Sequence, residues 1–159
     1  MIEDLDELVT KAVTDVFGTM LSMSMQRVPL PTTADIEPSI AGSVGFTGRV
    51  GGVVYIHTAA AFAKRITATF LQMKEWELNG DEMVNDAVGE IANMLVGHIK
   101  SRLVDRGMAC ALTVPSVVRG SNFSIQPVST SEGHVYSFEC GGQRVFVEVN
   151  LKPGEATRN

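Results

Sequence analysis

The sequence is poor in cysteine and has no cluster of positive charge, and each shortage excludes a class of protein. Its two cysteines, Cys110 and Cys140, lack metal-ligand spacing, so we interpret them as reduced packing residues. The 13 lysines and arginines form no cluster and the net charge is −5, which argues against a nucleic-acid partner, because such a partner needs a basic footprint. The histidines are too scattered to form a metal site: His57, His98 and His134.

Long apolar runs are also missing. No stretch approaches the roughly 20 apolar residues that a membrane-spanning helix needs. The chain starts with the acidic run MIEDLDEL, which does not fit a signal or transit peptide. We therefore predict a cytoplasmic protein that neither crosses a membrane nor binds a metal ion.

What remains is the composition of an ordinary globular domain. Hydrophobic residues make up 45% of the 159 residues and charged residues 19%, which suits a single domain over 1–159 with a sizeable core. Apolar periodicity and the positions of Gly and Pro predict helices over 3–24, 59–73 and 81–106; strands over 40–47, 52–57, 108–118, 135–140 and 144–150; an extended stretch over 123–127; a proline-containing connector over 27–36; and a polar tail over 153–159. We interpret Trp76, between the second and third helices, as a packing residue.

The chain repeats in two halves, about 1–74 and 75–152. Five residues of the first predicted helix match five of the third at a constant offset, and the two predicted hairpins also match. The helix residues are Glu7, Val9, Ala12, Val13 and Asp15, which correspond to Glu82, Val84, Ala87, Val88 and Glu90. The simplest account is a duplicated helix-plus-antiparallel-strands unit. We predict an α+β fold in which the two copies form one antiparallel sheet, with both long helices on one face.

Asn79 or Asp81 can cap the start of the helix predicted over 81–106, and Gly107 stands where a helix-terminating glycine belongs.

This helix has two different sides. Apolar residues at spacings of three or four form one stripe: Val84, Val88, Ile91, Leu95, Ile99 and Leu103. Nearly opposite is a polar stripe of Asp86, Glu90, Asn93 and Gly97, flanked by Met83 and Met94 on one side and by Gly89 and Ala92 on the other. Methionine packs adaptably and small residues allow close approach, so the polar stripe has the features of a docking surface. A solvated helix face with chance spacing is the alternative.

The first helix keeps the scaffold of this unit but not its polar stripe. At the positions that match Asp86, Glu90 and Asn93 it carries Lys11, Asp15 and Gly18. Because the exposed amide is absent there, we predict one functional site per chain, with the three residues of the first helix turned outward.

The spacing Asp86-x3-Glu90-x2-Asn93, followed by Pro115 in the run TVPSVVRG, resembles the CheC/CheX/FliY family of chemotaxis phosphatases. The resemblance covers nearly the whole chain, and the single intact motif resembles the CheX branch. It implies a CheC/CheX-like fold and a phosphatase that acts on the phosphoaspartate of a CheY-like response regulator. It also implies a symmetric homodimer paired through the sheets, and no cofactor of its own, because the Mg²⁺ belongs to the response regulator.

The same resemblance implies that Glu90 and Asn93 enter the partner's active site together. Residues three apart on a helix point the same way. An amide both donates and accepts hydrogen bonds, so Asn93 can align the attacking water, while Glu90 would pair with a lysine of the partner. Asp86 is expected to help docking or helix geometry, and Pro115 to mark a strand end or edge. The other residues expected to contact the partner are Gly97 of the polar stripe and the flanking residues Met83, Gly89 and Met94.

Two other functions stay open at this point. The first is a binding module without catalysis, which uses the same helix to tether a response regulator or a flagellar or chemotaxis component. The second is an α+β interaction domain with an unrelated signalling role. The intact Asn93 favours the phosphatase, because a tether has no need of a group that aligns water.

Overall fold

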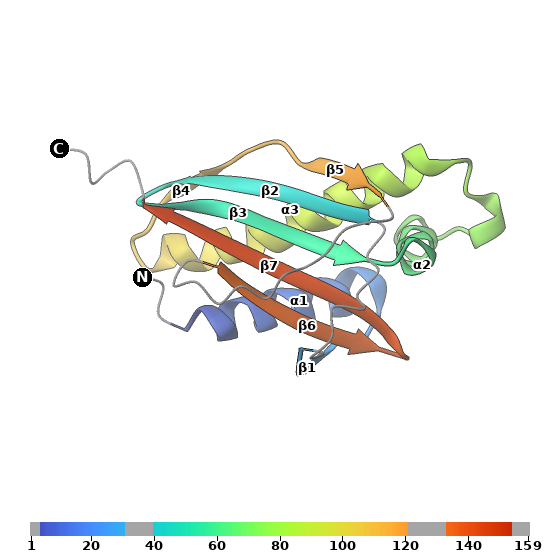
Figure 1. Cartoon of the computed structure of the whole chain (residues 1–159), viewed down its shortest axis with the longest axis horizontal. Coiled ribbons are helices and arrows are strands. Elements are labelled where there is room, and N and C mark those ends of the chain that lie inside the picture. Colours follow the sequence, from blue (N-terminus) through green and yellow to red (C-terminus); the bar gives the residue numbers. More distant parts are fainter. Residues whose placement is uncertain (1–3, 31–39, 121–132, 154–159) are drawn as a thin grey trace.

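The computed structural model describes residues 4–30, 40–120 and 133–153. They form a layered α+β structure in which the helices lie behind one antiparallel sheet in the view of Figure 1. In chain order the elements are α1 (Leu5–Leu21), β1 (Gln26–Val28), β2 (Ile40–Gly48), β3 (Val50–Thr58), α2 (Ala60–Leu71), the 3-10 helix η1 (Glu75–Glu77), α3 (Asp81–Asp105), β4 (Cys110–Leu112), β5 (Ser116–Arg119), β6 (Gly133–Cys140) and β7 (Gln143–Pro153). The extended stretch predicted over 123–127, part of the proline-containing connector and most of the predicted tail lie outside the described residues.

The sheet combines strands from both halves of the chain. Its order is β1-β6-β7-β3-β2-β4, β5 also pairs with β2, and every pairing is antiparallel. At the centre β3 pairs with β7 along its whole length, from Val50 opposite Pro153 to Thr58 opposite Val145. The predicted α+β architecture, with one antiparallel sheet and the long helices α1 and α3 on one face, is therefore confirmed (Figure 1).

The strand predicted over 108–118 is instead two short strands, β4 and β5, which both pair with β2. Between them the N–H of Thr113 donates to the carbonyl of Gly45 at 2.8 Å, and the N–H of Gly45 donates to the Thr113 hydroxyl at 2.8 Å. Pro115 follows and has no N–H with which to continue the ladder, so pairing resumes at Ser116. The hydroxyl of Thr113 and the ring of Pro115 thus divide the predicted strand.

Two other local predictions were wrong. Strand β1 pairs with Ser137–Glu139 of β6, although part of it lies in the segment predicted to be a connector. Its three residues are too few to show the alternation that identifies a strand. Trp76 lies on η1 and is 81% exposed, so it does not pack in the core.

The buried side of α3 is the one that the sequence predicted. All six residues of its apolar stripe are at most 5% exposed, and they belong to one core cluster with residues of α1 and the sheet. Helix α3 lies close to β2 because Gly42 faces it: a Cβ added to Gly42 would be 3.0 Å from Cγ1 of Val88. Burying one aliphatic side chain of this size stabilises a fold by roughly 1.5–3 kcal/mol. The stripe therefore fixes which side of α3 faces outward.

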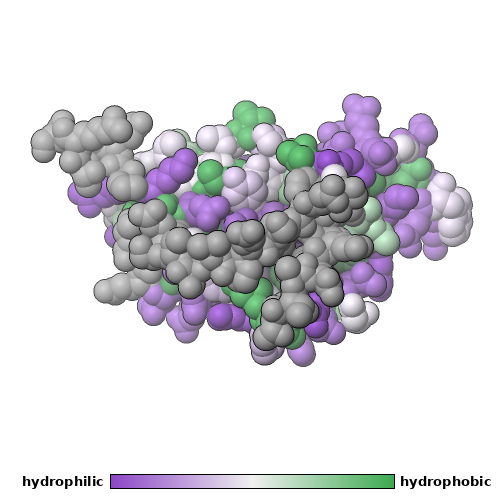
Figure 2. Space-filling model, in the orientation of Figure 1, coloured by the Kyte–Doolittle hydropathy of each residue, from purple (hydrophilic) through white to green (hydrophobic). Residues whose placement is uncertain are grey.

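The face of the sheet that carries no helix is toward the viewer in Figures 1 and 2. Where described residues are visible in Figure 2, hydrophobic side chains form small separate areas among hydrophilic ones. The apolar residues are instead concentrated between the sheet and the helices. In the described part of the chain, no helix combines the length and the apolar character needed to cross a membrane.

Candidate functional site

The polar stripe is carried by α3, and the end of this helix is closed by a glycine. Gly107 has a φ of 77°, a left-handed conformation that favours glycine. Its N–H donates to the carbonyl of Val104 at 2.9 Å, and the N–H of Met108 donates to the carbonyl of Leu103 at 2.8 Å. These two bonds form a Schellman motif, so the predicted helix-terminating role of Gly107 is confirmed.

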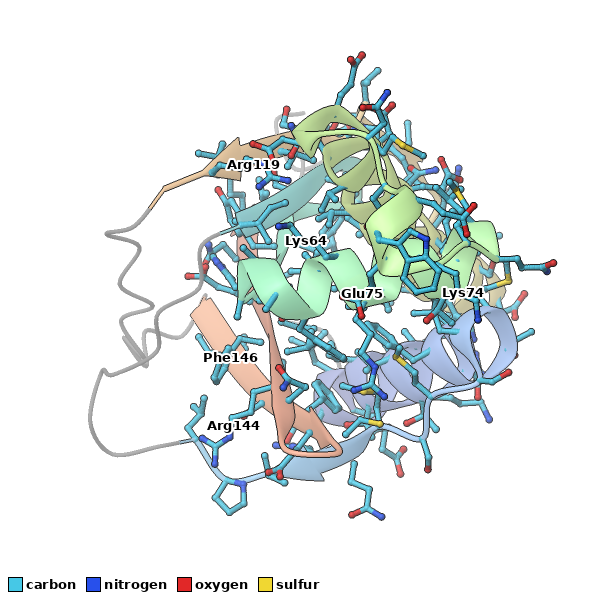
Figure 3. All side chains as sticks on the ribbon, turned by 90° about the vertical axis from the view of Figure 1, so that its right-hand side faces the viewer. Lys64, Lys74, Glu75, Arg119, Arg144 and Phe146 are labelled. Carbon is cyan, nitrogen blue, oxygen red and sulfur yellow. The ribbon has the colours of Figure 1, made fainter. Side chains whose placement is uncertain are left out.

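The first turn of α3 is held by an arginine from the edge of the sheet. The N-cap residue is Gly80, which makes no side-chain cap, so the predicted capping by Asn79 or Asp81 was wrong. Instead Arg119 of β5 donates from Nε to Oδ1 of Asn85 and from Nη2 to the carbonyl of Asp81, the latter at 3.3 Å. Figure 3, which views the molecule from the end where α3 begins, shows Arg119 at the end of β5. The arginine therefore ties the sheet edge to the start of the site helix.

Asp86, Glu90 and Asn93 lie on the outward side of α3, opposite its buried stripe. Asp86 and Glu90 are exposed and Asn93 is half-buried. Within the described ranges, no residue forms a hydrogen bond or an ion pair with these three side chains. Neighbours three or four apart on a helix have Cβ atoms about 5–6 Å apart. The carboxylate of Glu90 and the amide of Asn93 can therefore enter one cavity of a partner side by side.

One flank of the polar stripe is covered by the protein itself. Gly89 and Ala92 are buried. A Cβ added to Gly89 would lie 3.5 Å from both Cβ of Pro115 and Cγ2 of Val117. The segment that approaches Gly89 is thus the chain's own β5 region, which gives the small residue a role inside the fold. Pro115 is half-buried and lies against Gly89, the residue that precedes Glu90.

The other flank is open and faces α1. Met83, Met94 and Gly97 are half-buried, and Met94 packs on the edge of the core. The sulfur of Met83 accepts the N–H of Asn79 at 3.2 Å, which holds this side chain over the start of α3. Of the four residues beside Asp86, Glu90 and Asn93 that were predicted to contact a partner, the fold leaves these three accessible, whereas Gly89 is buried.

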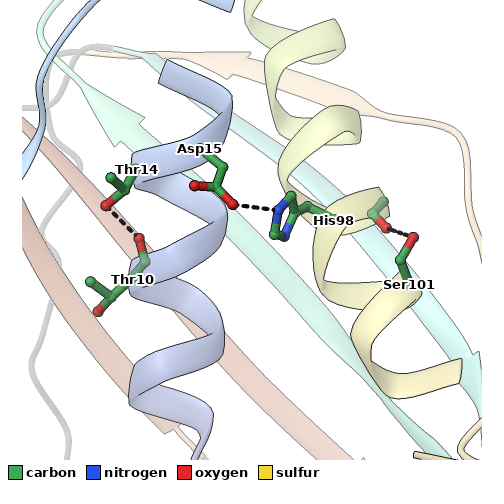
Figure 4. Close-up of polar contacts among 6 residues, drawn as sticks. Thr10, Thr14, Asp15, His98 and Ser101 are labelled. Atoms are coloured by element: carbon green, nitrogen blue, oxygen red, sulfur yellow. Dashed lines mark hydrogen bonds and ion pairs between the residues drawn. The ribbon is translucent and has the colours of Figure 1, made fainter. Parts of the chain in front are cut away.

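Helix α1 contributes one contact that the sequence did not predict. Lys11 and Gly18 are exposed, as predicted. Asp15 is not simply turned outward: its Oδ2 lies 3.0 Å from Nε2 of His98 on α3 (Figure 4). This contact joins the two long helices beside the polar stripe. The repeat predicted that α1 and α3 are equivalent, but it gave no signal that a side chain from one would bond to the other.

The two cysteines lie at the edge of the core. Both are free and half-buried, and burial raises the pKa of the Cys110 thiol, an effect that the charge of Lys100 opposes. Among the described residues, no group of three or more His, Cys, Asp or Glu side chains is placed to hold a metal ion. The chemistry that the described site offers is that of a carboxylate and an amide on a rigid helix.

The sequence matches a known protein family and is similar to a curated relative. The family model described as "Chemotaxis phosphatase CheX" matches residues 40–139. A curated protein of Thermotoga maritima, named "CheY-P phosphatase CheX", is 29% identical over 93 residues. The match covers 58% of this chain and 59% of that relative, so the chain aligns with little more than half of the curated protein's length.

Solved structures show the same fold. The crystal structure of a chemotaxis protein CheX from Desulfovibrio desulfuricans is 22% identical, with a TM-score of 0.77 over 92% of this chain and 97% of the other. A CheX from Borrelia burgdorferi, 19% identical, was solved in a complex with CheY, BeF₃ and Mg²⁺. Its TM-score is 0.74, and the match covers 94% of this chain and 98% of the other.

Proposed function

The chain belongs to the CheX family of chemotaxis phosphatases, and on this basis we propose that it hydrolyses the phosphoaspartate of a CheY-like response regulator. The observation that carries the proposal is the pair Glu90 and Asn93 on the outward side of α3. These side chains have no partner among the described residues, and the buried stripe behind them holds the helix in place. The name of the Thermotoga maritima relative and the partner in the Borrelia burgdorferi complex support the choice of substrate.

In the proposed reaction this chain supplies position rather than a nucleophile. An aspartyl phosphate is an acyl phosphate that needs mainly an aligned water and charge stabilisation. The amide of Asn93 holds a water in line with the P–O bond, because it can both donate and accept a hydrogen bond. The water oxygen bonds to phosphorus, and the bond between phosphorus and the aspartate oxygen breaks. The products are inorganic phosphate and a free aspartate carboxylate.

Glu90 sets the register of the complex. Its carboxylate pairs with a lysine in the partner's active site, which brings Asn93, one helical turn away, opposite the phosphoryl group. Asp86, one turn earlier, extends the acidic side of the stripe and assists docking. The protein needs no cofactor of its own in this scheme, since the Mg²⁺ that neutralises the phosphoryl oxygens is held by the response regulator.

The proposal also includes the oligomeric state of the protein and the compartment in which it acts. We propose a homodimer, because β4 and β5 form an outer edge of the sheet on which Val114 is 84% and Val118 is 53% exposed. We propose that it acts in the cytoplasm, as the sequence predicts. Each chain of the dimer would then carry one active site, on the outward side of its own α3.

The direct experiment is phosphate release from a phosphorylated CheY-like receiver domain, with and without this protein. Acceleration that requires Mg²⁺ on the receiver and disappears in Asn93→Ala is the expected result. A protein that binds the phosphorylated receiver without accelerating phosphate release would be a binding module instead. A protein that neither binds the receiver nor accelerates the reaction would leave the unrelated interaction domain as the remaining function.

A further inference from the structure

We propose that the groove between α1 and α3 is a second contact site for the response regulator, and that it receives an apolar side chain of the receiver domain next to the phosphoaspartate. This inference rests on the proposed function, because it takes the same partner. It adds a docking site to the polar stripe and assigns roles to Met20, Met94 and Gly97.

The groove is an open depression with a volume of about 540 Å³ between the two long helices. Its lining includes Asp15, Val16 and Met20 of α1 and Met94, Gly97 and His98 of α3. Met20 is 41% exposed, whereas Val16 is only 7% exposed and forms part of the floor. The contact of 3.0 Å between Asp15 and His98 fixes the spacing of the helices at this point (Figure 4).

The position of the groove determines which partner covers it. Met94 directly follows Asn93, and Gly97 lies one helical turn further along the polar stripe. A stable interface buries about 800 Å² on each partner, which corresponds to a circle roughly 16 Å in radius. Neighbours one turn apart on a helix are only about 6 Å apart. An interface of this size that is centred on Glu90 and Asn93 therefore also covers this groove.

The chemistry of the groove calls for an apolar occupant. The polar stripe offers two carboxylates and an amide, and such groups give register rather than an apolar interface core. Met20 and Met94 supply flexible, polarisable walls that adapt to an inserted side chain. Gly97 keeps the entrance open, since a Cβ added there would meet no atom within 4 Å. The same observation means that a side chain can be introduced at Gly97 without a clash inside this protein.

Two substitutions test the groove without touching the reacting residues. Gly97→Leu fills the entrance, and Met20→Lys places a charge on an apolar wall. The matched controls are Gly18→Leu, a helical glycine of α1 that also has no atom within 4 Å of an added Cβ, and Leu71→Lys, a residue of α2 that is 40% exposed. Neither control residue lines the groove. Thermal unfolding of all four variants shows whether each one folds.

The measurements are the affinity for a receiver domain loaded with Mg²⁺ and beryllofluoride, and the KM and kcat of phosphate release. We expect Gly97→Leu and Met20→Lys each to raise Kd and KM by about tenfold or more, as the loss of an interface anchor does, while kcat falls less. The two controls should bind like the wild type. In wild-type protein with labelled methionine methyl groups, the resonances of Met20 and Met94 should shift on adding the receiver, while that of the buried Met25 should not.

Each failure has a separate meaning. If the groove variants fold and bind the receiver as tightly as the wild type, while Asn93→Ala is inactive, the groove inference is overturned and the proposed function stands. If they change self-association but not receiver binding, the occupant is a second copy of this chain, and the inference is again overturned. If the wild-type protein itself neither binds nor dephosphorylates the receiver, the proposed function fails first.

Discussion

Pro115 packs against Gly89: a Cβ built on the glycine would lie 3.5 Å from Cβ of the proline, at ordinary van der Waals distance. The contact joins two parts of the sequence motif that are far apart along the chain, the helix that carries Glu90 and the proline that precedes β5. It also explains a small residue on the flank of the polar stripe by a contact within the protein, not by one with a partner.

The first prediction concerns this contact. Gly89→Ala should be tolerated and should stabilise the protein by up to about 1 kcal/mol, because glycine inside a helix is less favourable than alanine and the methyl group fits. Gly89→Leu should displace Pro115 and cost roughly 1–3 kcal/mol through overpacking. Chemical denaturation of both variants measures the difference. A leucine variant as stable as the alanine variant would show that the β5 region is not held against α3.

A second prediction separates catalysis from binding at Asn93. Asn93→Ala should change the free energy of unfolding by no more than about 0.5 kcal/mol, because the residue lies outside the core. The rate of catalysed phosphate release should fall about 100-fold or more, since a misplaced water loses the benefit of alignment. Binding to the beryllofluoride-loaded receiver should largely survive. Asn93→Asp should also be impaired, because a carboxylate accepts hydrogen bonds but does not donate one. Full activity in Asn93→Ala would refute the water-aligning role.

The third prediction concerns Glu90 and its effect on the affinity for the receiver domain. Glu90→Ala should weaken the complex with the loaded receiver, and Glu90→Lys should weaken it further, because two ammonium groups would face each other in a desolvated site. Titration of the receiver against each variant gives the ranking, and thermal unfolding checks that both variants fold. Equal affinities for wild type and Glu90→Lys would leave the ion pair without support.

A fourth prediction concerns the role of α1. A joint substitution of Lys11 and Asp15 does not test whether α1 is functional, because Asp15 contacts His98 and its loss would loosen the helix pair. Lys11→Ala alone should leave both phosphatase activity and stability unchanged within about 0.5 kcal/mol. Asp15→Ala should destabilise the fold by about 1 kcal/mol, the usual value of a partly exposed hydrogen bond. A large loss of activity in a folded Lys11→Ala protein would mean that α1 takes part in the function.

The fifth prediction concerns the proposed dimer. Val118 lies on β5 at the outer edge of the sheet and is 53% exposed. Val118→Lys should reduce the mass found by light scattering from two chains to one, because a charge on an edge strand opposes pairing. Val104→Lys, at a residue of α3 that is 46% exposed, is the matched control and should not change the mass. A wild-type protein that is already monomeric would rule out the dimer.

The sequence predicted those features that follow from periodicity. The buried side of α3 and the outward placement of Asp86, Glu90 and Asn93 follow from the 3.6-residue period of one helix. The end of the helix at Gly107 follows instead from the preference for glycine at a left-handed position. Contacts between elements were not predictable in this way. Arg119, His98 and Asp15 are ordinary polar residues within their own elements, and their roles arise only when the sheet edge and α1 are placed against α3. Pro115 was expected to mark a strand end, and β5 does begin directly after it. The sequence did not show that this end divides the strand predicted over 108–118, because the hydroxyl of Thr113 takes the place of a backbone partner there.

The strand order bears on how such a protein could have evolved, and on whether the two halves of the chain can fold separately. Strand β1, from the first half of the chain, completes the sheet beside β6 of the second, while β4 and β5, from the second half, complete it beside β2 of the first. Each half therefore lends its outer strands to the other. An ancestor with a single unit would have had to exchange these strands between two chains, as swapped dimers do. A present-day chain cut between α2 and α3 should yield fragments that are unstructured apart and regain the fold when mixed.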